Sequence, residues 1–187
     1  VSAHKIYGPK GVGALIARPG IPLAPRAHGG SQEDGRRTGT ENVPGIAGFG
    51  AAARLVARGE LHDLPAIGRL RDALWEKVRA AVPEARRNGG PAHVVPTTLS
   101  VTFPGIQADT LQIRLDLAGI AVSIGAACSS GAVTPSHVLL AMGLTQDEAR
   151  APLRFSLGRA TTAAEIDRTA AAIAESVAAL LGLAAAR

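Results

Sequence analysis

Apolar and polar positions follow two alternating periodicities along the chain, which predicts helices interleaved with strands. Apolar residues spaced three and four positions apart indicate two helices between about residues 44 and 82. A third helix is expected to open at Thr162, because Thr162 and Glu165 form the Thr-x-x-Glu pattern of a capping box. Short apolar or alternating runs predict strands at 12–17, 98–103, 119–123 and 153–157. The alternation indicates an α/β fold.

The same spacing predicts which helical faces are buried. The expected apolar stripes are Ile46, Phe49, Ala53 and Val56 in the first helix, Ile67, Leu70, Leu74 and Val78 in the second, and Ile166, Ile173, Val177 and Leu180 in the third. Arg71 and Trp75 lie off the stripe of the second helix.

Residues 111–118 fit both periodicities. Their leucines alternate as in a strand, yet they also fit one face of a helix with Asp109 as a possible N-cap, and the pattern leaves both open. Small residues at 125–130 predict a loop, and Thr134-Pro135 is typical of an N-cap followed by a first helical residue. Residues 19–40 form a long loop rich in Gly, Pro and Arg, which favours a functional role.

Composition limits the classes of protein that remain. The 187 residues carry a formal charge of +5 and only 3% aromatic residues, which disfavours nucleic-acid binding and suits a small anionic ligand. No uninterrupted apolar run reaches the length of a membrane span, so we expect a soluble, cytoplasmic protein. The single cysteine excludes an intramolecular disulfide, and no residue set has metal-ligand spacing, so we expect no metal.

Two segments hold candidate chemistry. The segment Ser2–Gly11 contains a hydroxyl, an imidazole and two amines before an apolar run. It fits an ordinary polar turn, or a Lys5 amine available for a Schiff base with Ser2 and His4 near an anion. Cys128 fits a small buried residue, or a nucleophile in a loop of small residues. A lone cysteine taken by itself favours the buried residue, whereas the small, polar residues around Cys128 suit a nucleophile in a mobile loop.

The remaining histidines are expected to have no chemical role. His62 and His93 lie in polar stretches and are predicted to be solvated. His137 is predicted to be structural, and nothing in the sequence assigns a role to His28.

Four motifs in order resemble the cysteine desulfurases, NifS-like and IscS-like enzymes of the class V aminotransferase fold. SAHKIYGPKGVGAL (2–15) is similar to their cofactor-lysine segment, and HGGSQEDGRRTGTENVPGIAGFG (28–50) to the stretch that follows. SIGAACSSGAVTPSHVLLAMG (123–143) resembles the catalytic-cysteine loop and LRFSLGRATTAAEID (153–167) the C-terminal signature. Asp34 departs from the family pattern, which usually has a basic residue there.

The resemblance implies roles for individual residues. Lys5 matches the lysine that links to pyridoxal 5′-phosphate (PLP), and Ser2 and His4 match residues that bind the cofactor phosphate. Thr40 matches a threonine that reaches the phosphate of the neighbouring subunit, which implies a homodimer. The nucleophile that accepts sulfur corresponds to Cys128, and the arginine that binds the substrate carboxylate corresponds to Arg154.

The resemblance also implies a fold and an activity. Residues 1–45 would end the large domain of a PLP-dependent transferase of fold type I, and residues 46–187 would form the linking helix and the small C-terminal domain, with residues 111–118 helical. The expected reaction converts L-cysteine to L-alanine and leaves a persulfide on Cys128 for an iron–sulfur scaffold or a carrier for tRNA thiolation.

The implied family subunit is about twice as long as this chain, so we expect a C-terminal fragment that is inactive or weakly active alone. The groups that stack on the cofactor ring and pair with its nitrogen would precede Ser2, as would the strands that pair with residues 12–17. Two alternatives stay open: a related selenocysteine lyase or aminotransferase, and a non-catalytic remnant or dimerisation module.

Overall fold

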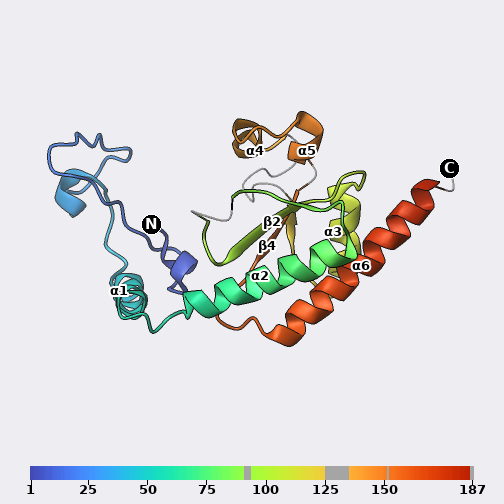
Figure 1. The fold of residues 1–187 in the computed structure, drawn as a ribbon. Helices are drawn as coiled ribbons and strands as arrows, with labels where there is room; N and C mark the ends of the chain where they lie inside the picture. Colours follow the sequence, from blue (N-terminus) through green and yellow to red (C-terminus); the bar gives the residue numbers. More distant parts are fainter. Residues whose placement is uncertain (91–93, 125–134, 151, 186–187) are drawn as a thin grey trace. The chain divides into compact units, whose positions relative to one another are not determined.

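A computed structural model describes residues 1–90, 94–124, 135–150 and 152–185, which divide into two compact units, Val1–His62 and Asp63–Arg187 (Figure 1). The first unit contains two short 3₁₀ turns, η1 (Ala3–Ile6) and η2 (Gln32–Gly35), and the helix α1 (Val43–Ala57). The domain boundary expected from sequence, between residues 45 and 46, falls inside α1.

The second unit is a four-stranded antiparallel sheet with helices. Its elements are α2 (Leu64–Ala81), β1 (Arg86–Arg87), β2 (Thr98–Thr102), α3 (Ala108–Leu117), β3 (Ser123–Ile124), α4 (His137–Ala141), α5 (Gln146–Arg150), β4 (Pro152–Ser156) and α6 (Ala163–Ala185). The strand order is β1-β2-β4-β3. Ser100 of β2 and Ser123 of β3 both lie opposite Arg154 of β4.

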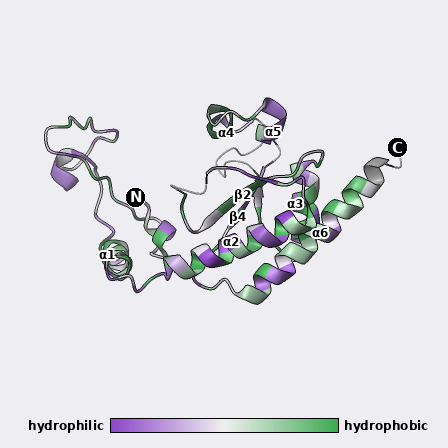
Figure 2. Cartoon of the chain, in the orientation of Figure 1, coloured by the Kyte–Doolittle hydropathy of each residue, from purple (hydrophilic) through white to green (hydrophobic). Residues whose placement is uncertain are grey.

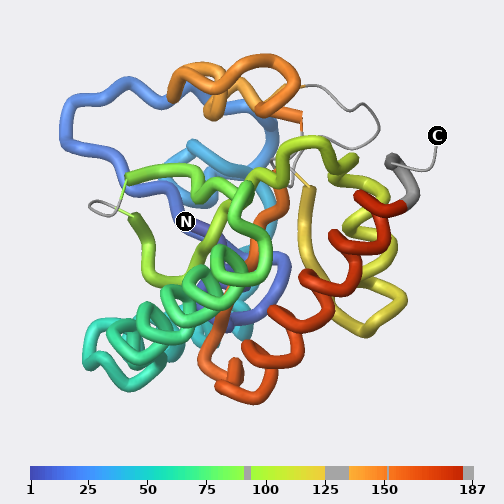
Figure 3. The backbone as a smooth tube through the Cα atoms, turned by 45° about the vertical axis from the view of Figure 1, so that its right-hand side comes forward, coloured from blue at the N-terminus to red at the C-terminus, as the bar shows by residue number. Residues whose placement is uncertain are grey.

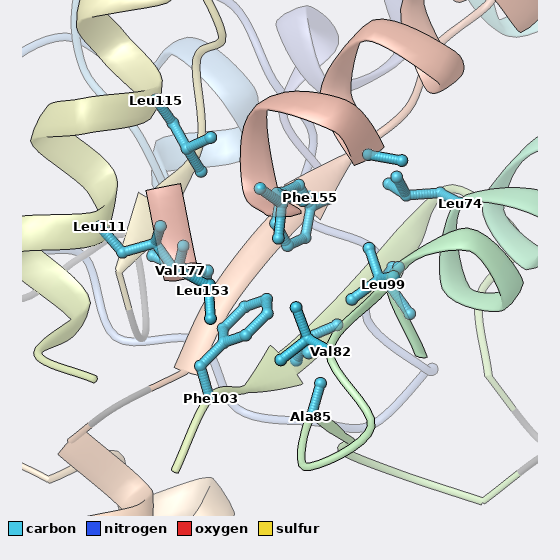
Figure 4. Close-up of a cluster of buried hydrophobic side chains, with 14 of the residues drawn as sticks. Leu74, Val82, Ala85, Leu99, Phe103, Leu111, Leu115, Leu153, Phe155 and Val177 are labelled. Carbon is cyan, nitrogen blue, oxygen red and sulfur yellow. The ribbon is translucent and has the colours of Figure 1, made fainter. Parts of the chain in front are cut away.

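The two faces of this sheet differ in polarity because side chains alternate along each strand. One face carries Leu99, Val101, Leu153 and Phe155, which form the hydrophobic core together with residues of α2, α3 and α6 (Figure 4). The neighbouring positions Ser100 and Arg154 therefore project from the opposite face. The fold thus holds Arg154 at the centre of a polar row.

Helices α2 and α6 lie side by side against the core (Figures 1 and 3). Apolar and polar residues alternate along both helices (Figure 2). The predicted stripes of these helices are confirmed: Ile67, Leu74, Val78, Ile166, Ile173 and Val177 are buried, and Leu70 and Leu180 pack against them half-buried.

Capping side chains define where the helices begin. Glu165 Oε2 accepts hydrogen bonds from Thr162 N (2.8 Å) and Thr162 Oγ1 (3.0 Å), and Glu165 N donates to Thr162 Oγ1 (3.3 Å), which confirms the capping box of α6. These bonds hold the pKa of Glu165 below its ordinary value, the backbone N–H of Thr162 contributing most. At the start of α2, Asp63 Oδ1 accepts from Ala66 N at 2.8 Å.

Several helical predictions need correction. Residues 111–118 lie in or at the end of the helix α3, whose N-cap is Gln107, so Asp109 lies in the first turn. Thr134 lies outside the described residues, and α4 starts at His137 with Ser136 as its N-cap. In α1 the predicted stripe is wrong, because the buried residues are Gly45 and Ala52.

Two strand predictions also differ from the structure, and two residues of α2 are more buried than the predicted stripe indicates. Residues 12–17 form no strand in the described chain, and Leu15 and Ile16 are 80% and 83% exposed. An apolar run indicates that a segment can be buried, but it does not specify which strand would pair with it. The expected strand at 119–123 shrinks to β3. Although Arg71 and Trp75 lie off the predicted stripe of α2, Arg71 is 8% exposed and Trp75 packs against the core.

No helix in the described part of the chain is long and apolar enough to cross a membrane.

Candidate functional site

The candidate lysine lies on a one-turn helix whose base is fixed by backbone hydrogen bonds. Ser2 precedes η1 in an extended conformation and forms a β-bridge with Gly13. Ala3 N donates to Val12 O at 3.1 Å, and Lys5 N donates to Ser2 O at 3.1 Å. Gly13 has to be glycine, since a Cβ there would lie 2.6 Å from the carbonyl oxygen of Val1. These backbone hydrogen bonds therefore fix the turn η1 that carries Lys5.

The structure brings three predicted site residues together on this turn. Ser2, His4 and Lys5 lie within four consecutive positions and all three are exposed, whereas Ala3 between them is fully buried. A hydroxyl, an imidazole and a primary amine are thus presented outward from one turn. This donor set fits a small aldehyde that carries a phosphate, because hydroxyl and imidazole groups donate to phosphate and an amine condenses with an aldehyde.

Thr40 follows a basic loop that is organised by its own side chains. Gln32 Oε1 in η2 accepts a hydrogen bond from Gly39 N at 3.1 Å, one residue before Thr40. Asp34, the departure from the family pattern, pairs with Arg36 at 3.1 Å, although both side chains are largely exposed. Thr40 is exposed, and it lies in the same compact unit as Lys5.

Arg154 lies in the second unit, at the centre of the polar row on the sheet. Its Nη2 donates to Ser123 Oγ at 3.2 Å, and its Nε is buried without a hydrogen-bond partner among the described residues. A half-buried guanidinium with an unused buried N–H is suited to a carboxylate, which accepts two parallel hydrogen bonds from such a fork.

The rest of the polar row is held by Asn88. Its side-chain nitrogen donates to Ser100 Oγ (3.1 Å) and to Thr102 Oγ1 (3.0 Å), and Thr102 Oγ1 donates to Asn88 Oδ1 (3.2 Å). These bonds satisfy the polar groups next to Arg154 on its β2 side.

Cys128 lies outside the described residues, as does His93. The described chain fixes what flanks the segment: Ile124 pairs with Leu153 in the sheet, and Ser136 N donates to Ala149 O at 3.1 Å. Helix α5 is further tied to β1 by an ion pair between Arg86 and Glu148 at 2.8 Å. Both ends of the Cys128 segment therefore join anchored elements.

Arg71 and Asp72 of α2 form an ionic cluster with Arg87 of β1. Asp72 accepts hydrogen bonds from the Arg71 guanidinium at 2.9 and 3.0 Å and from Arg87 at 3.1 Å. The hydrogen bonds from Arg71 hold the pKa of Asp72 below its ordinary value of 3.8. Arg71 also donates to Val95 O at 3.1 Å, so this cluster stabilises the loop before β2.

Sequence reasoning missed three residues around these sites: Tyr7, His62 and Ser123. The prediction that His62 is solvated is wrong, because the side chain is half-buried, its Nδ1 is buried, and its ring lies against that of Tyr7. Nothing in the sequence pattern singled out Tyr7. The pairing of Ser123 with Arg154 depends on strand register, which the sequence pattern does not state.

No group of three or more His, Cys, Asp or Glu residues in the described chain is arranged to hold a metal ion.

Comparison with known proteins shows the family to which the chain belongs. The family model described as aminotransferase class-V matches residues 1–169. A curated cysteine desulfurase from Cereibacter sphaeroides is 50% identical over 168 residues, covering 90% of this chain and 43% of the relative. The chain spans less than half the length of the curated relatives it matches.

Solved structures of related proteins have a similar fold. A NifS-like protein superposes with a TM-score of 0.80 and 38% identity, over 95% of this chain and 45% of the other. SspA in complex with cysteine gives a TM-score of 0.58 and 34% identity, over 86% of this chain and 44% of the other. The resemblance to cysteine desulfurases and the expected α/β fold are thereby confirmed. With a family model that runs from the η1 segment into α6, the chain belongs to the aminotransferase class-V family.

Proposed function

We propose that the full-length protein is a PLP-dependent cysteine desulfurase that converts L-cysteine to L-alanine and leaves the sulfur as a persulfide on Cys128. The observation that carries the proposal is the 50% identity to a curated cysteine desulfurase over 90% of the chain. A structural relative at 34% identity that is described in complex with cysteine supports the choice of substrate.

The donor set on η1 fits PLP. The Ser2 hydroxyl and the His4 imidazole would donate to its phosphate, and the Lys5 amine would hold its aldehyde carbon. When bound, PLP supplies that aldehyde and a ring that draws electrons from the substrate α-carbon. We further propose that Thr40 reaches the phosphate of a neighbouring subunit in a homodimer, and that residues 1–45 belong to the large domain.

Lys5 also moves a proton. When its amine is free, Lys5 would act as the base that removes the α-proton of the substrate. The hydrogen bonds of Ala3 N with Val12 O and of Lys5 N with Ser2 O fix the backbone that carries this amine.

Arg154 binds the substrate carboxylate. Ser123 occupies one nitrogen of the guanidinium, and the buried Nε has no partner in the described chain, so N–H donors remain for the substrate. Two parallel hydrogen bonds fix both the position and the plane of the carboxylate.

Cys128 takes up the sulfur. Its thiolate attacks the substrate sulfur, the new S–S bond forms as the C–S bond breaks, and the electron pair of the C–S bond stays on the substrate β-carbon, which then takes a proton. The products are alanine and a persulfide. A sulfur-acceptor protein with a free thiol, serving iron–sulfur assembly or tRNA thiolation, would regenerate the Cys128 thiol.

The test compares Cys128→Ser with Lys5→Ala in the full-length protein. Cys128→Ser should abolish alanine formation and the added sulfur mass on the 125–136 peptide, while hydrogen exchange at the substrate α-carbon continues. Lys5→Ala should abolish both, and borohydride reduction of the wild type should fix the cofactor on Lys5. Alanine formation by Cys128→Ser at the wild-type rate would refute the persulfide step and favour a selenocysteine lyase or aminotransferase.

A further inference from the structure

Two residues after Lys5 the chain reverses through a strained conformation. Tyr7 has φ 60° and ψ 17°, in the left-handed region that is unfavourable for a residue with a side chain. The reversal lets Tyr7 N and Gly8 N both donate to Ala3 O, the latter at 2.9 Å. Such strain persists only where surrounding contacts hold it in place.

One of those contacts comes from the far end of the same unit. The ring of Tyr7 lies against the imidazole of His62, with centroids 5.2 Å apart and planes tilted by 55°. His62 follows α1, and the neighbouring Leu61 is buried at 6% exposure. Aromatic pairs of this geometry are stabilising. The contact therefore helps to hold Tyr7 in its left-handed conformation.

A second contact joins η1 to α1 itself. Pro9, two residues beyond Tyr7, lies so close to Gly48 of α1 that a Cβ at position 48 would come within 2.6 Å of Pro9 Cγ and 3.1 Å of Cδ. The backbone of α1 and the proline ring touch directly, and only glycine permits this approach.

We propose that α1 and His62 form a seat that positions the Lys5 amine, through the Tyr7–His62 and Pro9–Gly48 contacts. The proposal rests on the cofactor-binding role of Lys5 proposed above. Gly48 and His62 are positioning residues in it, because they act on Lys5 through Tyr7 and Pro9. Together with the β-bridge between Ser2 and Gly13, the seat fixes η1 on both sides of Lys5.

Helix α1 contains its own matched control. At Gly50, two residues from Gly48, an added Cβ would meet only the end of Arg54, at an ordinary 3.7 Å. Gly48→Ala and Gly50→Ala therefore make the same change in helix propensity in one helix. Only the first pushes against Pro9.

The experiment measures how fast borohydride fixes added PLP on Lys5 of the full-length protein, relative to Lys77 of α2 as an internal reference. Gly48→Ala should slow the labelling of Lys5 by about tenfold or more, since a displacement of about 1 Å at a reacting group has large effects on rate. Gly50→Ala should label like the wild type. Pro9→Ala removes Cγ and Cδ, the two ring atoms that lie against Gly48, so it should slow the labelling of Lys5 as well, and a wild-type rate for Pro9→Ala would overturn the Pro9–Gly48 contact as a positioning device.

A second pair of variants tests the aromatic contact without adding bulk. Tyr7→Gly relieves the left-handed strain and removes the ring, so it should fold but label Lys5 slowly, whereas Tyr7→Phe keeps the ring and should label normally. The pH midpoint of the visible absorption band of the lysine-bound cofactor should shift in Gly48→Ala and Tyr7→Gly only. A purely structural role would lower the unfolding temperature without moving this midpoint.

The outcomes separate the two proposals. Absence of label on Lys5 in the wild type would overturn the proposed function. If Lys5 is labelled in the wild type, equal rates for Gly48→Ala and Gly50→Ala would overturn the Pro9–Gly48 contact as a positioning device, and a wild-type rate for Tyr7→Gly would overturn the Tyr7–His62 contact. Should Gly48→Ala fail to fold, the Tyr7 pair decides by itself.

Discussion

The hydrogen bond between Ser123 and Arg154 leads to a prediction about substrate affinity. Ser123 Oγ accepts from Arg154 Nη2 at 3.2 Å, and the two residues lie directly opposite each other on β3 and β4. Ser123→Ala removes the acceptor and leaves the half-buried guanidinium free to rotate. Fixing such a side chain again on binding costs about 0.5–1.5 kcal/mol.

This cost should appear in the Michaelis constant. About 1 kcal/mol corresponds to a rise of about fivefold in KM for L-cysteine. The turnover number should stay unchanged, because the carboxylate contact is made equally in the ground state and the transition state. The assay is alanine formation by the full-length protein as a function of cysteine concentration.

Two variants control for this prediction. Ser123→Thr keeps the hydroxyl and should keep KM, and Ser156→Ala removes a hydroxyl two residues from Arg154 on the same face of β4. An unchanged KM in Ser123→Ala, or an equal rise in Ser156→Ala, would refute the reasoning that Ser123 orients Arg154.

Two further predictions concern stability, both measured by denaturant unfolding. Leu111→Ala empties a fully buried site in α3 and should cost about 2–5 kcal/mol, whereas Leu117→Ala in the same helix, at 84% exposure, should change stability by less than about 0.5 kcal/mol; equal effects would contradict the assigned helix face. The hydrogen bonds from Arg71 lower the pKa of Asp72, so the folded state favours the carboxylate and gains stability above the ordinary value of 3.8. This gain is lost as pH falls through the lowered pKa, so Asp72→Asn should be less stable than the wild type at pH 7, and the difference should shrink below about pH 4; a difference that does not depend on pH would exclude the carboxylate as its source.

The local spacing patterns of α2 and α6 were read correctly from the sequence. The stripe Ile67, Leu74 and Val78 and the capping box at Thr162 and Glu165 involve residues within one or a few helical turns, so their geometry follows from 3.6 residues per turn. Arg71 lies beside that stripe and is nevertheless buried. The acceptor Val95 O, and Arg87, which shares Asp72 with Arg71, come near it only after folding.

The candidate site divides in the same way. The chemistry that the sequence suggests for Lys5 needs only neighbours within a few residues, and the structure presents Ser2, His4 and Lys5 on one turn. The corresponding prediction for residues 12–17 was wrong, because an apolar run does not specify a pairing partner, and Ile16 is 83% exposed.

The sequence alone determined the core faces of α2 and α6, the capping box of α6 and the segment that carries the candidate lysine. Only the tertiary structure decided that Ser123 pairs with Arg154 and that Gly48 approaches Pro9. These pairs lie 31 and 39 positions apart in the chain, so no local periodicity relates them. Their contact depends on strand register in one case and on the seating of η1 on α1 in the other, and both are properties of the packed chain.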